Sequence, residues 1–530
     1  MESLASLLLN SYDTNPHALI LRYFLFTGIS CFLGFISGLT FFEFFVSFFI
    51  LFCIDFLFFK FVPRDGSDMV AWMGFTLFLD CVYYTLIKKQ DPRESMRGQV
   101  YDETESTCFD FVADTGDGIR ATRFVAQLMS CENQMPKKGD FIIHGGDICY
   151  PFPTISELTT RFLTPYTQAF KSTKARMYFA LGNHEYTDGL IMFQEQLLPL
   201  CEIGTIVTPQ QTTYYALKLS HGWWVFVIDL GPEPEDINES QLKYFESIPR
   251  GNDDRIILVY HTPDWIKVPV MGFSGMKRLR AWRSTLGSSV RLVIAGDLHY
   301  YRRMEDDRGT TYLIAGHGGA FSHCTHFPSV QKVQIAENHY LSTVTEYPTS
   351  DLSRKQWDDG WMFMFHQSSN VVYARFLAAV YVGLFVGKYA AIVSGLWLVI
   401  LNLVLCTTSQ YTGTSEKKAV AIGLAVLHSI MHGGMVYLIK HFVATQSPVI
   451  DVCCCYALGL IVSPFISALY FRIAVEVFHW HYNEAIAVVQ CEGNKGFCRF
   501  KLEENGSITV YSMVSDDLKS HRLLEQFTIR

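Results

Sequence analysis

Five short groups of polar residues follow apolar stretches in the middle of the chain. In order they are Asp114-Thr115-Gly116, Gly146-Asp147-Ile148-Cys149-Tyr150, Gly182-Asn183-His184-Glu185, His261 and Gly296-Asp297-Leu298-His299. Their carboxylate, amide and imidazole groups are ligands for hard or borderline divalent cations. Enough donors are present for two ions that share one carboxylate. A metal pair about 3.5–4 Å apart clamps the attacking and leaving oxygens of a phosphoryl transfer and lowers the pKa of a bound water.

The elements that must position these donors are buried strands. Each donor group directly follows a short run rich in Val, Ile, Leu or Phe, such as Phe109–Ala113, Phe141–His144, Ile256–Tyr260 and Val290–Ala295. Helical stretches are expected between some of the runs, at Ile119–Cys131 and Ile155–Phe170. Functional residues at the C-terminal ends of buried strands are typical of layered α/β enzymes. We therefore expect an α/β domain.

The ordered set of motifs closely resembles the calcineurin-like metallophosphoesterase superfamily over about residues 91–330. The Asp-x-Gly and Gly-Asp-x-x-Tyr forms resemble its purple acid phosphatase branch, in which the tyrosine binds a ferric ion. The resemblance implies a four-layer α/β/β/α sandwich. It also implies a pair of divalent or trivalent metal ions drawn from Fe, Mn and Zn.

The resemblance assigns roles to individual residues. It implies a first metal position held by four residues: Asp114, Asp147, Tyr150 and His299. Asp147 would bridge to a second position that Asn183 and His261 complete. His184 would protonate or stabilise the leaving oxygen, with Glu185 or another carboxylate orienting it.

One position departs from the family pattern. The family usually has Gly-His-x-His, and this chain has Asp297 where the first histidine belongs. A carboxylate can still bind the second ion, and as a harder ligand it should favour Mn or Fe over Zn. The alternative is a weak second site.

Two further polar residues lie close to the motifs. His317 sits in Ala315-Gly316-His317-Gly318-Gly319, a glycine-rich strand exit that either borders the phosphate pocket or forms a turn with a structural histidine. Asp117 follows the first motif, where it is either a carboxylate behind the metal ligands or the cap of a loop.

Composition fits a globular domain joined to membrane spans. The chain has 530 residues and a formal charge of -8, which argues against a nucleic-acid partner because such a protein needs a basic face. Charged residues are only 18% and aromatic residues 15%. Apolar runs long enough to cross a bilayer, which takes ~20 residues, lie near both ends, at 18–38, 39–61, 69–87, 376–406, 419–439 and 449–478.

These runs divide the chain into four predicted parts. They are an N-terminal membrane region of about three helices (1–90), a metallophosphoesterase domain (91–366), a second membrane region of three or four helices (367–480) and a small polar, strand-containing tail (481–530). Basic residues flank the domain on both sides and predict that it is cytosolic. An odd number of cysteines within it agrees with a reducing compartment: Cys108, Cys131, Cys149, Cys201 and Cys324.

One pair of histidines lies within a predicted span. His428 and His432 are four residues apart and so share a helical face. They are candidates for a metal within the membrane, but polar contacts between helices are the favoured interpretation.

The sequence therefore predicts a multi-pass, membrane-bound phosphoesterase that hydrolyses a phosphate mono- or diester with a metal-activated hydroxide. Spans on both sides of the domain favour a lipid-linked or headgroup phosphoester and contact with membrane lipids, while phosphoprotein and nucleotide substrates stay open. The competing hypothesis is a catalytically degenerate domain that regulates a membrane transporter or scaffold. The main argument for this hypothesis is that Asp297 stands where the family usually has a histidine.

Overall fold

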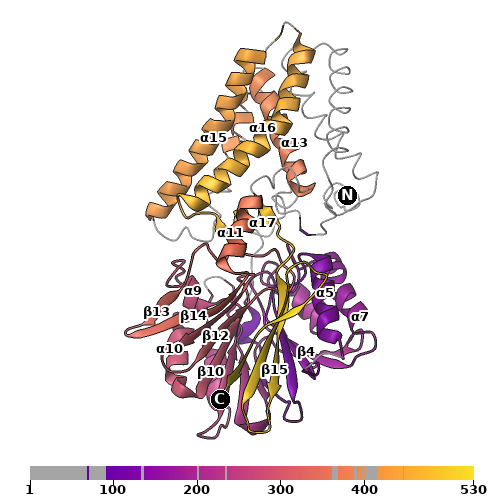
Figure 1. Cartoon of the computed structure of the whole chain (residues 1–530), viewed down its shortest axis with the longest axis vertical. Coiled ribbons are helices and arrows are strands. Elements are labelled where there is room, and N and C mark those ends of the chain that lie inside the picture. The colour runs from indigo at the N-terminus through magenta and orange to yellow at the C-terminus, as the bar shows by residue number, and fades with distance from the viewer. Residues whose placement is uncertain are drawn as a thin grey trace. The chain divides into compact units, whose positions relative to one another are not determined.

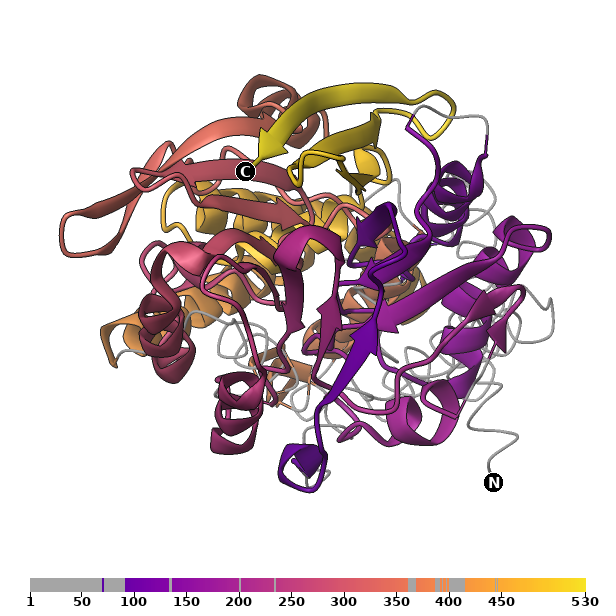
Figure 2. The same cartoon turned by 90° about the horizontal axis from the view of Figure 1, so that it is seen from below.

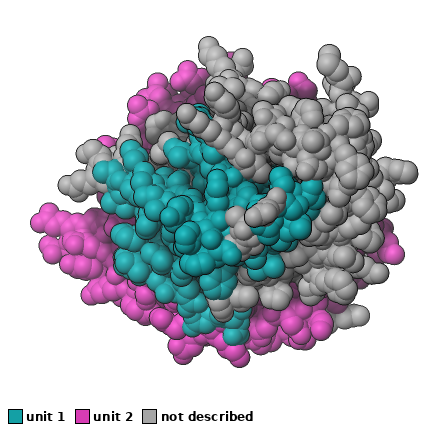
Figure 3. Space-filling model, turned by 90° about the horizontal axis from the view of Figure 1, so that it is seen from above, with its two compact units in different colours: residues 1–67, 71–82, 357–489 teal, residues 68–70, 83–356, 490–530 magenta. Residues whose placement is uncertain are grey.

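The computed structural model describes residues 69–70, 91–132, 136–199, 202–232, 235–360, 368–386, 391–392, 394–396, 398–399, 415–443, 445 and 447–530. The chain divides into two compact units, which Figure 3 colours separately. We call residues 68–70, 83–356 and 490–530 the two-sheet unit, and residues 1–67, 71–82 and 357–489 the helical unit.

The first sheet of the two-sheet unit has nine strands among the described residues, in the order β1-β7-β8-β9-β10-β12-β11-β14-β13. Its neighbouring strands β8, β9, β10 and β12 run parallel. The strands are β1 (Gln99–Asp102), β7 (Tyr215–Lys218), β8 (Trp223–Val227), β9 (Arg255–Val259), β10 (Val290–Ala295), β12 (Thr311–Ala315), β11 (Tyr301–Asp306), β14 (His339–Tyr347) and β13 (Lys332–Ala336).

The second sheet has eight strands in the part of the chain that the structure describes, in the order β17-β16-β15-β2-β3-β4-β6-β5. Strands β2, β3, β4 and β6 run parallel. The strands are β17 (Arg522–Ile529), β16 (Ile508–Ser515), β15 (Lys495–Leu502), β2 (Cys108–Val112), β3 (Phe141–His144), β4 (Ala175–Phe179), β6 (Ile206–Val207) and β5 (Glu202–Ile203).

A hydrophobic core fills the space between the sheets. Alternate residues of each strand point into it, such as Phe109 and Phe111 of β2 and Ile257 and Val259 of β9. The residues between them face outward, where Ile256 and Leu258 belong to a separate cluster. Parallel strands buried on both faces are apolar throughout, which explains why these strands are continuous apolar runs in the sequence.

Helices cover the outer face of each sheet (Figures 1 and 2). The eight-stranded sheet packs against α5 (Ile119–Ser130), α7 (Thr164–Ala169) and the π-helical turn between α6 (Ile155–Glu157) and α7, at Leu158–Leu163. The nine-stranded sheet packs against α8 (Glu239–Ser247), α9 (Asp264–Lys267) and α10 (Lys277–Leu286). Shorter helical turns lie at Pro92–Glu94, Phe193–Leu197, Ser220–Gly222 and Gly287–Ser289. The predicted mixed α/β class is confirmed.

The C-terminal strands extend the eight-stranded sheet, although the sequence analysis separated residues 481–530 from the domain at 91–366. β15 pairs antiparallel with β2, and the Phe500 and Phe109 rings stack with centroids 4.6 Å apart. Beside them the buried Arg499 donates to both oxygens of Asp110, at 2.7 and 2.9 Å. Without β15 this edge of β2 would expose unpaired backbone N–H and C=O groups, which can pair with a strand of another chain. Residues 490–530 are therefore part of the two-sheet unit.

The helical unit contains α13 (Ser368–Val386), α15 (Ser415–Val443), α16 (Pro448–Glu476) and α17 (Tyr482–Val489), and α11 (Ser350–Asp359) straddles the boundary between the units. By length and apolar composition, two described stretches are long enough to cross a membrane, at Ile422–Phe442 and Pro448–Glu476. They correspond to the predicted runs at 419–439 and 449–478. The runs at 18–38 and 39–61 lie outside the described residues, as do 71–87 of the third run and much of 376–406.

Candidate metal centre

The predicted donors come from loops at the C-terminal ends of strands in both sheets. Asp114 follows β2, and Asp147 and Tyr150 follow β3. On the facing sheet, His261 follows β9 and His299 follows β10. Loops at this end of parallel strands are free to carry functional groups on a rigid scaffold.

Four of the donors converge on one point. The Tyr150 hydroxyl lies 2.9 Å from Asp147 Oδ2, 3.2 Å from Asp114 Oδ1 and 3.1 Å from His299 Nε2. His299 Nε2 is 3.6 Å from Asp114 Oδ1. These are the four residues predicted for the first metal position.

His261 adds a fifth donor to the same group. Its Nε2 lies 3.4 Å from Asp147 Oδ2 and 3.9 Å from Asp114 Oδ1. Donor atoms of Asp114, Asp147 and His261 all lie within 4.8 Å of one another. His261 Nε2 is buried without a hydrogen-bond partner, and a buried polar atom of this kind calls for a ligand.

Backbone carbonyls fix the orientation of both imidazoles. His261 Nδ1 donates to the Gly145 carbonyl and His299 Nδ1 donates to the Phe321 carbonyl, each at 2.8 Å. The Nε2 of each imidazole therefore faces the carboxylates. A hydrogen bond at the far nitrogen is how proteins orient metal-binding histidines.

The spacing of these donors fits a cation. Ligands bound at about 2.1 Å lie about 3.0–3.6 Å apart when they are neighbours in a coordination shell. The contacts among Asp114, Asp147, Tyr150 and His299 are 2.9 to 3.6 Å long. The residues at the first position therefore match the group that the motifs imply.

The three strand-end aspartates share a left-handed backbone. The φ angles are 57° at Asp114, 53° at Asp147 and 64° at Asp297. Such angles are uncommon outside glycine and cluster at functional sites. Gly182 and Gly296 are required beside them, since a side chain at either position would collide with the carboxylate of Asp147 or Asp114, respectively.

Burial and mutual charge shift the pKa values of these groups. Burial raises the pKa of Asp114 well above its usual value; the Asp147 charge adds to this effect and His261 opposes it. Burial alone would lower the pKa of His261, but the carboxylates of Asp147 and Asp114 raise it well above normal. Burial also raises the pKa of Tyr150, with the same two carboxylates adding to the shift. The group thus holds protons that a bound cation would displace.

His184 lies at the edge of this group with its side chain 20% exposed. Its Nδ1 donates to the Pro151 carbonyl at 2.7 Å, and its Nε2 is 3.9 Å from Asp147 Oδ2. Glu185 was expected to orient His184. Its carboxylate instead accepts three backbone N–H groups, from Gly182, Asp147 and Ile148, so that it ties two motif loops together. Asn183 is half-buried beside them.

Asp297 has a partner that the sequence analysis missed. The ammonium of Lys267, at the end of α9, lies 2.5 Å from Asp297 Oδ2, and both residues are buried. Asp297 is not in the described group of donors formed by Asp114, Asp147 and His261. Glu235 is close by: burial raises its pKa to about 7, and the charge of Lys267 opposes the shift. In the sequence, the feature that could have pointed to this partner is the lysine six residues after His261.

Asp117 and His317 have structural contacts. Asp117 accepts the N–H of Val70 at 2.7 Å and that of Phe321 at 3.0 Å, which fits the loop-capping alternative. His317 is fully buried, its carbonyl accepts the N–H of Gly496, and its ring packs edge-on against Tyr301. Burial and the nearby Lys495 lower the pKa of His317 to about 3.

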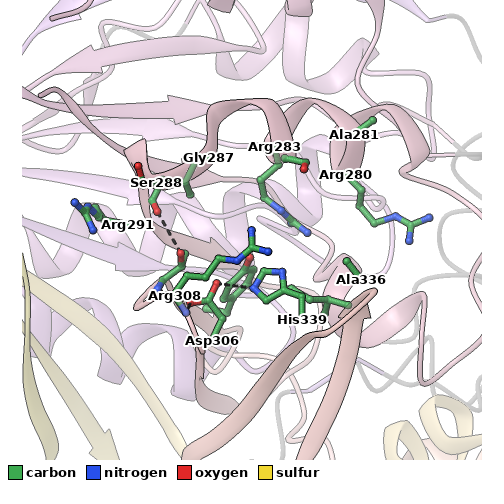
Figure 4. A pocket seen from close by; sticks show the side chains of 15 residues that line it. Arg280, Ala281, Arg283, Gly287, Ser288, Arg291, Asp306, Arg308, Ala336 and His339 are labelled. Carbon is green, nitrogen blue, oxygen red and sulfur yellow. Dashed lines mark hydrogen bonds and ion pairs between the residues drawn. The ribbon is translucent and has the colours of Figure 1, made fainter. Parts of the chain in front are cut away.

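A separate pocket of about 360 Å³ lies beside α10, β10 and β11, and none of the predicted site residues lines it (Figure 4). Asp306 and His339 on its wall are hydrogen-bonded at 3.0 Å. The same Asp306 also accepts the backbone N–H groups of Arg308 and Thr310, as a turn-forming carboxylate does.

The histidine pair of the helical unit makes polar contacts. His432 Nε2 and His428 Nε2 are 3.0 Å apart, and the Tyr381 hydroxyl is 2.8 Å from His432 Nδ1. Tyr381 lies on α13, so these contacts join α13 to α15, in agreement with the favoured interpretation.

Comparison with known proteins agrees with this geometry. Residues 109–301 match the family model of calcineurin-like phosphoesterases, which are hydrolases of phosphoester bonds. The match spans the loops from Asp114 to His299 and confirms the resemblance for this part of the chain. No curated protein matches the sequence significantly.

Proposed function

We propose that the two-sheet unit is a metal-dependent hydrolase of phosphate mono- or diesters. The observation that carries the proposal is the buried group formed by Asp114, Asp147 and His261, whose donor atoms lie within 4.8 Å of one another, with Tyr150 and His299 in contact with it. A metal ion held there would polarise the phosphoryl group and lower the pKa of a water molecule.

His184 is the proposed acid. The hydrogen bond from Nδ1 to the Pro151 carbonyl leaves Nε2 to carry the proton. Nε2 lies 3.9 Å from Asp147 Oδ2, at the edge of the metal donors. In this proposal the partly exposed imidazole donates the Nε2 proton to the oxygen of the departing alcohol.

We propose a lipid-linked or headgroup phosphoester as the substrate. The same chain carries two stretches long and apolar enough to span a membrane, so the hydrolase would be tethered where such esters are concentrated. In this proposal the two-sheet unit is cytosolic, as the flanking basic residues predict.

A second candidate function is regulation of a membrane protein by a catalytically inactive domain. The Lys267–Asp297 ion pair favours it, because this pair occupies a predicted ligand. A one-metal site that still turns over substrate would exclude it.

The test combines metal analysis with turnover. The full chain, purified in detergent, is assayed with 4-nitrophenyl phosphate and bis(4-nitrophenyl) phosphate before and after treatment with a chelator. We expect hydrolysis of at least one ester, loss of activity on chelation and recovery with Mn²⁺, Zn²⁺ or Fe. Bound metal without hydrolysis of any phosphoester would support the regulatory alternative.

A further inference from the structure

The donors predicted for the second metal position face different partners from those of the first. The motifs predict that Asp147, Asn183, His261 and Asp297 surround it. In the structure His261 Nε2 lies 3.4 Å from Asp147, which is predicted for both positions, and 3.9 Å from Asp114, which is predicted for the first. Asp297 faces the Lys267 ammonium at 2.5 Å.

Burial of the ion pair opposes its replacement by a metal. Lys267 is 5% exposed and Asp297 is 8% exposed. A buried ammonium needs an anionic partner, and removing that partner leaves a charge uncompensated. A second dication bound by Asp297 would do this and would also bring positive charge beside the lysine.

Charge counting leads to the same result. Asp114, Asp147 and Asp297 contribute three negative charges, and Glu235 beside Lys267 contributes a fourth when it is ionised. One divalent ion and the Lys267 ammonium together contribute three positive charges. A second divalent ion would raise the positive charge to five within a buried site, where unbalanced charge is costly.

The donor atoms of Asp114, Asp147 and His261 also form a compact group, all within 4.8 Å of one another. His261 Nε2 lies 3.4 Å from Asp147 Oδ2, the carboxylate predicted for both positions. The backbone N–H of Asp297 donates to both oxygens of Asp114, at 3.1 and 2.9 Å. Asp297 thus supports the first position through its backbone while its side chain holds Lys267.

We propose that the centre holds one metal ion, at the first position, and that the Lys267 ammonium, held by Asp297, supplies the second positive charge of the site. The proposal rests on the proposed metal-dependent phosphoesterase function. In this proposal the Lys267 ammonium supplies the positive charge that the motif pattern assigns to a second metal ion.

Metal content tests the proposal without relying on activity. The full chain is loaded with Mn²⁺, freed of excess metal and analysed by mass spectrometry for ions per chain and by electron paramagnetic resonance. We expect about one ion per chain and a signal without exchange coupling. Lys267→Met frees Asp297 and removes the ammonium, so this variant should gain a second ion and a coupled signal.

Lys138→Met is the matched control. Its side chain is 14% exposed, so it is also a shielded lysine, but it precedes β3 at the opposite end from the metal donors. This variant should keep one ion. One ion in both the wild type and Lys267→Met would overturn the assignment of Lys267.

Failure of this inference and failure of the proposed function give different results. Two coupled ions in the wild type would overturn the one-ion proposal and leave a metal-dependent phosphoesterase standing. No ion in the wild type after loading with Mn²⁺, Zn²⁺ or Fe would overturn both. The wild-type measurement decides the ion count even if Lys267→Met does not fold.

Discussion

The two metal positions predicted by the motifs are built from similar residues but differ in their surroundings. At the first position Asp114 and Asp147 face a phenol and two imidazoles whose far nitrogens are fixed by carbonyls. At the second, Asp297 has the same left-handed backbone as those aspartates, yet its carboxylate faces an ammonium. Whether an aspartate can bind a metal thus depends on the charges around it as well as on its place in a motif.

The largest expected effect comes from the carboxylate common to both positions. Asp147→Asn should lose most bound metal and essentially all turnover, a loss beyond the ~10²–10⁴-fold typical of a proton-transfer group. The physical reason is that Asp147 touches Tyr150, His261 and the His184 backbone at once. Metal content and turnover are measured together.

Asp140→Asn is the control for this variant. Asp140 is a half-buried carboxylate that accepts the N–H groups of Thr107 and Cys108, at the start of β3. It should keep both metal and turnover. Metal binding that survives in Asp147→Asn would show that the first position does not depend on this carboxylate.

His184→Ala should separate proton transfer from metal binding. We expect kcat to fall by ~10²–10⁴-fold with metal content unchanged, because the imidazole is 3.9 Å from Asp147 Oδ2 and lies outside the converging donors. Loss of metal in His184→Ala would show that His184 is a metal ligand. The residues assigned to the two metal positions would then be wrong.

The sheet that carries the first position should depend on its C-terminal strands. Arg499→Met leaves Asp110 buried without its partner, and breaking such a pair typically costs about 3–5 kcal/mol of unfolding free energy. Denaturation followed by tryptophan fluorescence measures the change. Arg522→Met removes an exposed pair with Asp516 and should shift stability by less than about 0.5 kcal/mol. Equal small shifts would contradict the role given to β15.

The smallest effect concerns a second buried lysine, which contrasts with Lys267. Lys495 donates to the Ser322 hydroxyl and the Gly493 carbonyl, and burial lowers its pKa to about 8. Because its unfolded pKa is about 10.5, the unfolded chain keeps this proton longer as the pH rises. The folded state should therefore gain stability between pH 8 and 10.5, by about 1 kcal/mol from pH 7 to 9.

Comparison of the wild type with Lys495→Met isolates this pH dependence, because the other titrating groups are common to both. The difference in stability should change with pH in the predicted direction. A difference that is flat from pH 7 to 9 would mean that the ammonium of Lys495 is no more costly than one in water.

The motifs predicted the strand ends well because each is a local pattern. Apolar runs followed by Gly, Asp, Asn or His were enough to place β2, β3, β9 and β10 and the loops behind them. The covering of β2 by β15 was not predictable in this way. It depends on a contact between Arg499 and Asp110, which are 389 positions apart in the sequence, and no local pattern records such a contact.

The sequence by itself determined the α/β class, the order of the donors and the presence of apolar stretches long enough to span a membrane, since these follow from residue type and periodicity. Only the tertiary structure decided which donors share one point and which do not. Loops from two sheets meet there, and their charges neutralise one another over a few ångströms. For this reason the carboxylate of Asp297 faces Lys267, which belongs to none of the motifs.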